Sequence, residues 1–222
     1  MDSAPMNMVL LFGALSLLPL VFMTATSFVK ISVVFSILRS ALGTAQVPSG
    51  IIIAALSAIL SLYVMAPVGA EMLEAAAPAA NSVNWNAPLG PHSFDAFRRA
   101  GEKMAEPLKV WLSRHANAKE TTLFLNLAQE ARPVAERQNL TRNDLLVVFP
   151  AFLITELSEA FLIGFLIFLP FLVIDLVVAN IALALGMQTL SPSTIALPFK
   201  LLLFVAVDGW YLLSRALLAG YH

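Results

Sequence analysis

The sequence lacks cysteine and is poor in charge and in histidine. None of its 222 residues is Cys, only 12% are charged, and the three His are His92, His115 and His222. The absence of Cys excludes disulfide frameworks, thiolate nucleophiles and Cys-based metal sites. The formal net charge of −1 argues against a nucleic-acid partner, because phosphate backbones are bound chiefly by clustered Lys and Arg. His92 and His115 show no zinc-like spacing, so neither a metal nor a cofactor is expected.

Apolar residues stand where charged ones are missing. They make up 59% of the chain, whereas a soluble domain is roughly half apolar and about 25% charged. The first long run, Val9 to Val29, is close to the roughly 20 residues that cross a bilayer. A secretory signal would have a basic first region and a short apolar core, and this stretch has neither feature. The start of the chain therefore predicts a retained membrane helix.

A helical hairpin is predicted for the first part of the chain. Lys30 and Arg39 follow the first run, and Gly and Pro break the pattern before a second run from Ile51 to about Val68. The connection is then a short basic loop, and such loops tend to stay in the cytoplasm. Both ends of the hairpin would lie on the other side, which is the periplasm in a Gram-negative cell.

The middle of the chain, from about Glu71 to Asp144, is polar and carries nine of the thirteen basic residues. Loops longer than about 60 residues translocate largely regardless of charge, so this segment is also expected in the periplasm. After a stretch rich in Ala, Asn and Pro at 75–91, apolar residues recur at helical spacing on either side of residue 115, with Ser93 as a candidate N-cap. We predict a small helical cap.

The last part of the chain is again apolar. Thr141 to Asp144 has the pattern of a capping box, and the sequence stays apolar from Leu145 to Leu185, with Pro150 and Pro170 as possible kinks. A turn near 186–192 leads to a final apolar helix over Thr194 to Ala219.

The predicted fold is therefore all-α and membrane-associated. An apolar helical hairpin (1–73) and a second apolar hairpin (145–222) flank a small helical polar segment (74–144).

Charged residues lie inside the apolar sequence and are the candidate functional residues. They are Glu156, Glu159, Asp175, Lys200 and Asp208, with Arg215 on the same helix as the last two. Each charge at the centre of a membrane helix costs about 2.5–3.5 kcal/mol, so three unpaired acids would cost roughly 7–10 kcal/mol. These side chains must find partners, water, or a depth outside the hydrocarbon.

Three interpretations of these charges stay open. The simplest is pairing within or between subunits, with Lys200 bound to an acid of the preceding helix. A proton or ion relay is the functional alternative, and in the third the helices do not lie conventionally in lipid. Paired carboxylates also suit acid–base chemistry, but no nucleophile or metal-ligand cluster accompanies them, so an enzyme is not expected.

The motifs of the last part resemble one family. They are the stretches 149–152 (FPAF), 156–165 (ELSEAFLIGF), 170–175 (PFLVID), 185–187 (LGM), 191–192 (SP), 197–201 (LPFKL) and 207–210 (VDGW), with 27–31 (SFVKI) and 38–39 (LR) near the start. The chain resembles the FliP/YscR/HrcR/SpaP family, the SctR-type core component of type III secretion and flagellar export apparatuses. The likeness covers nearly the whole chain except the middle segment, and the short middle and the lack of a cleavable leader favour the injectisome branch.

The resemblance implies a homo-pentamer that assembles with SctS-like and SctT-like proteins into a conical export gate. The gate lies in the bacterial inner membrane and passes unfolded proteins. Its helices are raised toward the periplasm rather than lying in a flat bilayer, so the buried charges would face neighbouring subunits or the channel.

The resemblance also implies a methionine-rich loop between the last two helices, which acts as a gasket around the substrate. The matching residues here are Met187, Gln188 and Thr189. Met187 fits the pattern, because its flexible side chain seals against varied surfaces. Gln188 and Thr189 stand where further Met residues are usual, and they would make the ring wetter.

Two functional hypotheses follow. The first is a pore-forming subunit of the export gate, without chemistry of its own. The second is a small ion-coupled membrane transporter that uses Glu156, Glu159 and Asp175.

Overall fold

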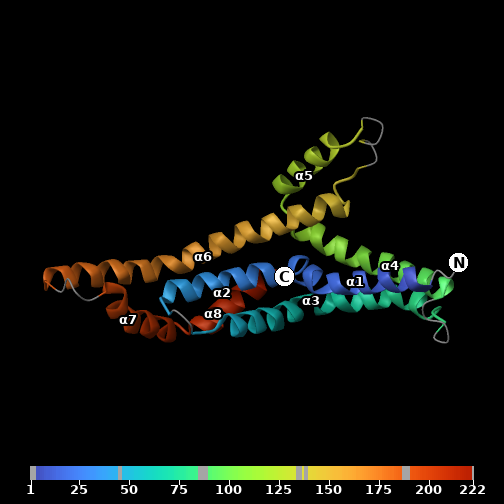
Figure 1. Cartoon of the computed structure of the whole chain (residues 1–222). Coiled ribbons are helices and arrows are strands. Elements are labelled where there is room, and N and C mark those ends of the chain that lie inside the picture. The colour runs from blue at the N-terminus through green and yellow to red at the C-terminus, as the bar shows by residue number, and fades with distance from the viewer. Residues whose placement is uncertain are drawn as a thin grey trace. The chain divides into compact units, whose positions relative to one another are not determined.

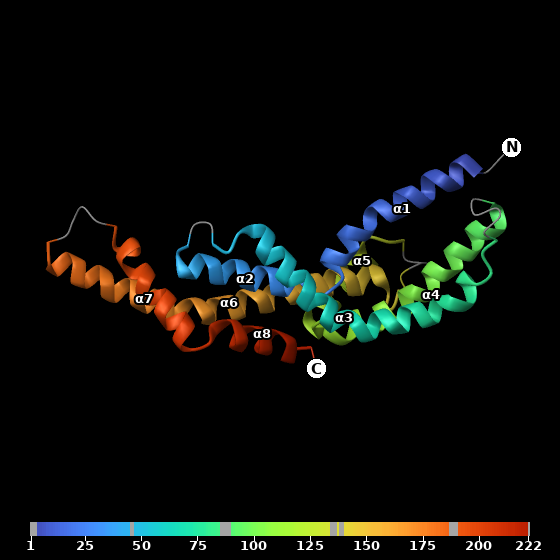
Figure 2. The same cartoon turned by 90° about the horizontal axis from the view of Figure 1, so that it is seen from below.

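A computed structural model describes residues 4–44, 47–84, 90–133, 137, 140–186 and 191–221. Within these residues the chain is all-α and has no strand, as predicted. The helices are α1 (Ala4–Thr24), α2 (Phe28–Leu42), α3 (Gly50–Ala80), α4 (Pro91–His115), α5 (Ala118–Glu130), α6 (Leu145–Ala184), α7 (Pro192–Ala206) and α8 (Gly209–Ala219). Figure 1 labels them in chain order, and Figure 2 shows the same helices from below.

The chain forms two compact units that differ from the predicted segments. The first unit comprises residues 1–26 and 65–155, and the second comprises residues 27–64 and 156–222. Each unit therefore draws on separate stretches of the sequence. The long helices α3 and α6 each contribute one part to either unit.

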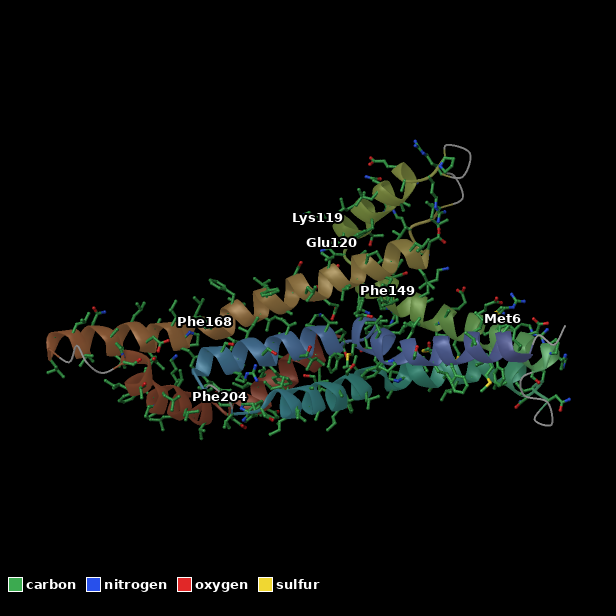
Figure 3. All side chains as sticks on the ribbon, in the orientation of Figure 1. Met6, Lys119, Glu120, Phe149, Phe168 and Phe204 are labelled. Atoms are coloured by element: carbon green, nitrogen blue, oxygen red, sulfur yellow. The ribbon has the colours of Figure 1, made fainter. Side chains whose placement is uncertain are left out.

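The first unit contains most of the polar sequence. Helix α4 is amphipathic and buries Trp111 and Leu112, and the Trp111 ring packs on Phe152 of α6 with 5.1 Å between ring centroids. The backbone N–H of Asn117 donates to Thr155 Oγ1 at 3.0 Å, and the Asn117 side chain caps α5. Figure 3 shows α5 with the side chains of Lys119 and Glu120 at its start. The predicted helical character of this segment is confirmed.

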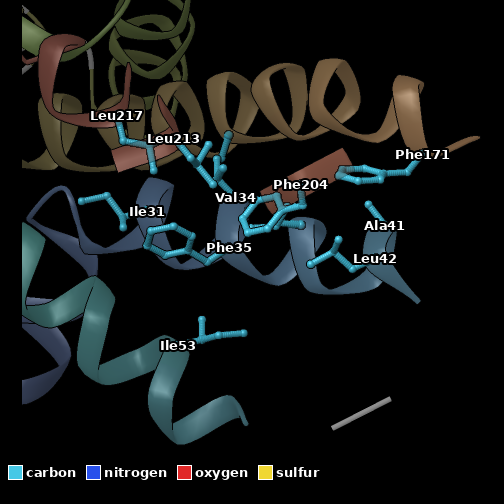
Figure 4. Close-up of a cluster of buried hydrophobic side chains, with 12 residues drawn as sticks. Ile31, Val34, Phe35, Ala41, Leu42, Ile53, Phe171, Phe204, Leu213 and Leu217 are labelled. Carbon is cyan, nitrogen blue, oxygen red and sulfur yellow. The ribbon is translucent and has the colours of Figure 1, made fainter. Parts of the chain in front are cut away.

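The second unit has its core around α2. The buried residues of this core are Ile31, Val34, Phe35, Leu38, Ala41, Leu42, Ile53, Ala160, Phe171, Phe204, Leu213 and Leu217, and Figure 4 shows them between α2, α3, α6 and the last two helices. At Gly164, α2 and α6 approach so closely that a Cβ atom would lie 2.3 Å from Ile37 Cδ1. Phe168 of α6 and Phe204 of α7 (Figure 3) also belong to this packing.

The basic loop predicted after the first apolar run is wrong. Lys30 and Arg39 lie inside helix α2, which ends at Gly43 with φ +76°. The connection from α2 to α3 spans residues 43–49 and contains no Lys or Arg. The helix forms because residues 28–42 place apolar side chains at helical spacing around Lys30, so hydropathy alone mistook a buried cation for a loop marker.

Other boundaries also differ from the prediction. Helix α3 continues to Ala80, into the stretch predicted to be flexible. Ser93 is not an N-cap, because α4 begins at Pro91 with Gly90 before it. At the start of α6 the Thr141 N–H donates to an Asp144 carboxylate oxygen at 2.7 Å, which is one half of the predicted capping box.

The final helix is broken rather than continuous. Helices α7 and α8 meet at an angle of 60°, at Asp208, which has a left-handed backbone (φ 51°) that Asp tolerates better than most residues. Gly209 is buried beneath the Phe204 ring, where a Cβ atom would lie 2.2 Å from the nearest ring carbon. Trp210 then packs edge-on against Phe204 at 5.3 Å. These aromatic contacts hold the bend.

Two helices, α3 and α6, are long and apolar enough to cross a membrane, and bent pairs raise this number to as many as four. Helix α6 has 40 residues, which is about 60 Å at 1.5 Å per residue. That is about twice the hydrocarbon thickness of a bilayer.

Candidate functional site: two buried charge clusters

The first charge cluster consists of Lys30, Glu156, Glu159 and Tyr221. Lys30 Nζ lies 2.9 Å from Glu156 Oε1 and 2.6 Å from Glu159 Oε2. Lys30 and Glu156 are 4% and 0% exposed, whereas the Glu159 side chain is half exposed. Glu156 and Glu159 reach the same ammonium because residues three apart on a helix share a face. One buried cation therefore serves two carboxylates.

Tyr221, just beyond the end of α8, completes this cluster. Its hydroxyl donates to Glu156 Oε2, and Lys30 Nζ lies 4.3 Å from the centroid of its ring. Burial, and after it the Glu156 carboxylate, raises the pKa of the Tyr221 hydroxyl above its usual value. The hydroxyl thus stays protonated and remains a donor. A cation over an aromatic ring is itself stabilising, most of all away from water.

The second charge cluster joins three helices at the other end of α2. Lys200 of α7 lies 2.7 Å from Asp175 Oδ2 of α6 and donates to the carbonyl of Ala41 at 2.9 Å. The Ala41 carbonyl is in the last turn of α2, where backbone acceptors lack helical partners and cations are favoured. Gly43, which ends α2, lies beside this ammonium, since a Cβ there would be in ordinary van der Waals contact with Lys200 Nζ at 3.7 Å.

Together the two clusters fix α2 along α6. Lys30 lies in the first turn of α2 and meets α6 at Glu156, and Lys200 joins the last turn of α2 to α6 at Asp175. Both helices therefore run in the same direction (Figure 1). The predicted pairing of Lys200 with an acid of the preceding helix is confirmed.

Asp208 does not join the buried charges in the single chain, contrary to the prediction. It is exposed at the bend between α7 and α8, and its side chain makes no ion pair among the described residues. Arg215 on α8 is likewise exposed. Asp208 lies at the break between α7 and α8 rather than within one continuous helix.

The predicted gate residues Met187, Gln188 and Thr189 lie outside the described residues. Sequence reasoning missed two others, Tyr221 and Gly43. Tyr221 stands alone after an apolar helix, and only the fold brings it to Glu156. Gly43 carried a local signal, since Gly directly after a helix predicts a left-handed cap.

These features define a class of protein. The chain is an α-helical membrane protein whose buried charges bind one another, and no group of three metal-ligating side chains occurs among the described residues.

Comparison with known proteins gives the family. Residues 11–217 match the model of the FliP family. The chain is 43% identical over 218 residues to Yop proteins translocation protein R of Yersinia pestis, covering 97% of this chain and 95% of that protein. It is 41% identical to hypersensitivity response secretion protein HrcR of Ralstonia nicotianae (97% of each chain). Flagellar biosynthetic protein FliP of Bacillus subtilis is 36% identical, over 99% of this chain and 93% of that protein. The chain belongs to the FliP family, a structural component of secretion apparatuses and not an enzyme.

Proposed function

We propose that this chain is a pore-forming subunit of the type III export gate, through which unfolded proteins cross the bacterial inner membrane. The observation that carries the proposal is the family match over residues 11–217, together with relatives named as translocation and secretion proteins. In this proposal five copies of the chain assemble with SctS-like and SctT-like proteins. Relatives named for virulence-type secretion support the injectisome branch.

The length and charge spacing of α6 support an environment of protein rather than lipid alone. Its charges divide it into uncharged stretches at 145–155, 160–174 and 176–184, the longest of 15 residues. None reaches the roughly 20 residues of a simple span. Many large apolar side chains of α6 are nevertheless exposed, including Phe161, Phe165 and Leu166. Neighbouring subunits would cover these apolar side chains and could supply polar partners for the charges of α6.

The charge balance of the second unit supports a further copy of this chain as a neighbour. The unit holds four bases and four acids, namely Lys30, Arg39, Lys200, Arg215, Glu156, Glu159, Asp175 and Asp208. Within one chain, Lys30 serves two acids and Lys200 serves one. One acid, Asp208, and two arginines are left over among the described residues, so an identical neighbour could supply the complementary charges. Asp175 Oδ1, buried and without a hydrogen-bond partner among the described residues, is a second group that such a neighbour could satisfy.

The polar segment is proposed to lie on the periplasmic side. With Lys30 and Arg39 in a helix, the charge of a short loop no longer supports this orientation. The proposal now rests on the family resemblance and on the ease with which long segments translocate.

The loop with Met187, Gln188 and Thr189 is proposed to close the gate around the substrate. Replacing Gln188 and Thr189 by Met should reduce leak of small ions through the assembled pore, because apolar flexible side chains exclude water. Leak is measured as the conductance of membranes that contain the complex. An unchanged conductance would count against a sealing role.

The decisive functional experiment neutralises the acids in the bacterium that carries the gene. In a deletion strain, the triple variant Glu156→Gln, Glu159→Gln, Asp175→Asn should weaken assembly of the complex, with secretion partly rescued by overexpression. An ion-coupled transporter would instead lose ion transport irrespective of expression level. Proton movement across liposomes by the purified single chain would overturn the gate proposal.

A further inference from the structure

The residues that follow helix α8 lie against the first charge cluster. Helix α8 ends at Ala219, a turn follows at Gly220, and Tyr221 then meets both Lys30 and Glu156. In Figure 1 the C-terminal end lies by the start of α2. Leu217, one helical turn before Tyr221, is 1% exposed and belongs to the core. The last turn of α8 is therefore held by an apolar contact and a polar one.

The hydrogen bond between Tyr221 and Glu156 satisfies a polar group on each residue. The Glu156 carboxylate uses Oε1 for Lys30 and Oε2 for the Tyr221 hydroxyl. A buried carboxylate oxygen that loses its donor carries the full cost of its desolvation. Tyr221 thus donates to the second oxygen of the carboxylate, and its ring covers the ammonium. In return, Glu156 accepts the hydrogen bond of the Tyr221 hydroxyl.

We propose that residues 218–221 form a C-terminal strap that closes over Leu217 and the first charge cluster and is held shut by Tyr221. Opening of the strap withdraws the donor from Glu156 and uncovers Leu217. The packing of α8 in the bent α7–α8 pair then depends on the Lys30–Glu156 ion pair.

A thiol reporter tests this strap, because the chain has no Cys of its own. Leu217→Cys places a single thiol under the strap, and Cys is a small apolar residue that buries well. The complex purified in detergent is exposed to N-ethylmaleimide, and the labelling rate is followed by mass spectrometry. In this background Tyr221→Leu should raise the labelling rate about tenfold, since a hydrogen bond to a charged group favours closure by about that factor or more.

Two further variants separate the parts of the contact. Tyr211→Leu is the matched control, because Tyr211 lies on α8 but is exposed, and the labelling rate of this variant should equal that of the parent. Tyr221→Phe keeps the ring over Lys30 and loses only the hydroxyl, so its labelling rate should fall between those of the parent and Tyr221→Leu.

A second test changes the acceptor of this hydrogen bond, Glu156, instead of the donor. Glu156→Gln keeps a side-chain oxygen for the Tyr221 hydroxyl, whereas Glu156→Leu removes it, so labelling should be faster in Glu156→Leu. Tyr221→Phe changes no packing volume beyond one oxygen and keeps the test valid if Tyr221→Leu fails to assemble. The proposal is overturned if Tyr221→Leu, or in its place Tyr221→Phe, labels at the rate of Tyr211→Leu.

Discussion

Removal of the Lys30 ammonium is the most informative perturbation of the buried charges. Lys30→Met keeps most of the side-chain volume but leaves Glu156, 0% exposed, without its cation. Breaking a buried ion pair by removing one partner costs about 3–5 kcal/mol. Glu159 adds little, because its side chain is half exposed and pairs of exposed charges contribute about 0–1 kcal/mol. The Tyr221 donor remains, so we expect the lower end of the range, about 3 kcal/mol.

The assay is the thermal stability of the detergent-purified complex, together with the abundance of the chain in membranes. A loss of about 3 kcal/mol is a large part of a typical folding free energy of 5–15 kcal/mol, so abundance should fall markedly. The control is Lys119→Met on α5, an exposed position, where the change should stay within about 0.5 kcal/mol.

The double variant Lys30→Met, Glu156→Gln isolates the charge effect. Replacing both members of a buried pair by neutral groups is often close to neutral, and Gln still accepts a hydrogen bond from Tyr221. Most of the lost stability should return. The reasoning is refuted if Lys30→Met is as stable as Lys119→Met, or if the double variant is no more stable than Lys30→Met.

Three glycines test the close packing of the second unit. Gly164→Val should separate α2 from α6 and abolish assembly, because even a Cβ meets Ile37 at 2.3 Å; partial recovery with Ile37→Ala would show that this contact is the cause. Gly209→Ala should destabilise the α7–α8 bend by about 1–3 kcal/mol, because the Phe204 ring stands 2.2 Å from the new Cβ; an unchanged melting temperature would argue against the bend. Gly43→Ala should cost about 1–2 kcal/mol, because a left-handed backbone strains a residue with a Cβ, and a melting curve identical to that of the parent would contradict this.

Composition and periodicity were sufficient for the class and for most helices. Apolar runs located α3, α6 and the membrane character of the chain, and the pattern around Trp111 gave α4. The sequence also indicates that Glu156, Asp175 and Lys200 need partners, because an ion in apolar sequence must be paired, and all three form ion pairs.

The failures have a common physical cause. Hydropathy treats a cation as a mark of water, so Lys30 was placed in a loop although Glu156 holds it in the core. It also treats a continuous apolar stretch as one helix, whereas the left-handed backbone at Asp208 divides the last one. Tyr221 could not be found, because its partners lie far away in the sequence. Each of these features depends on tertiary contacts that local patterns do not contain.

We propose that this chain works as one of several subunits around a protein-lined path. Native mass spectrometry of the complex extracted in mild detergent measures the number of subunits. We expect a particle with five copies of this chain and with the SctS-like and SctT-like partners, and fewer copies in the Lys30→Met variant. A single chain in its detergent micelle, stable without partners, would refute the proposal.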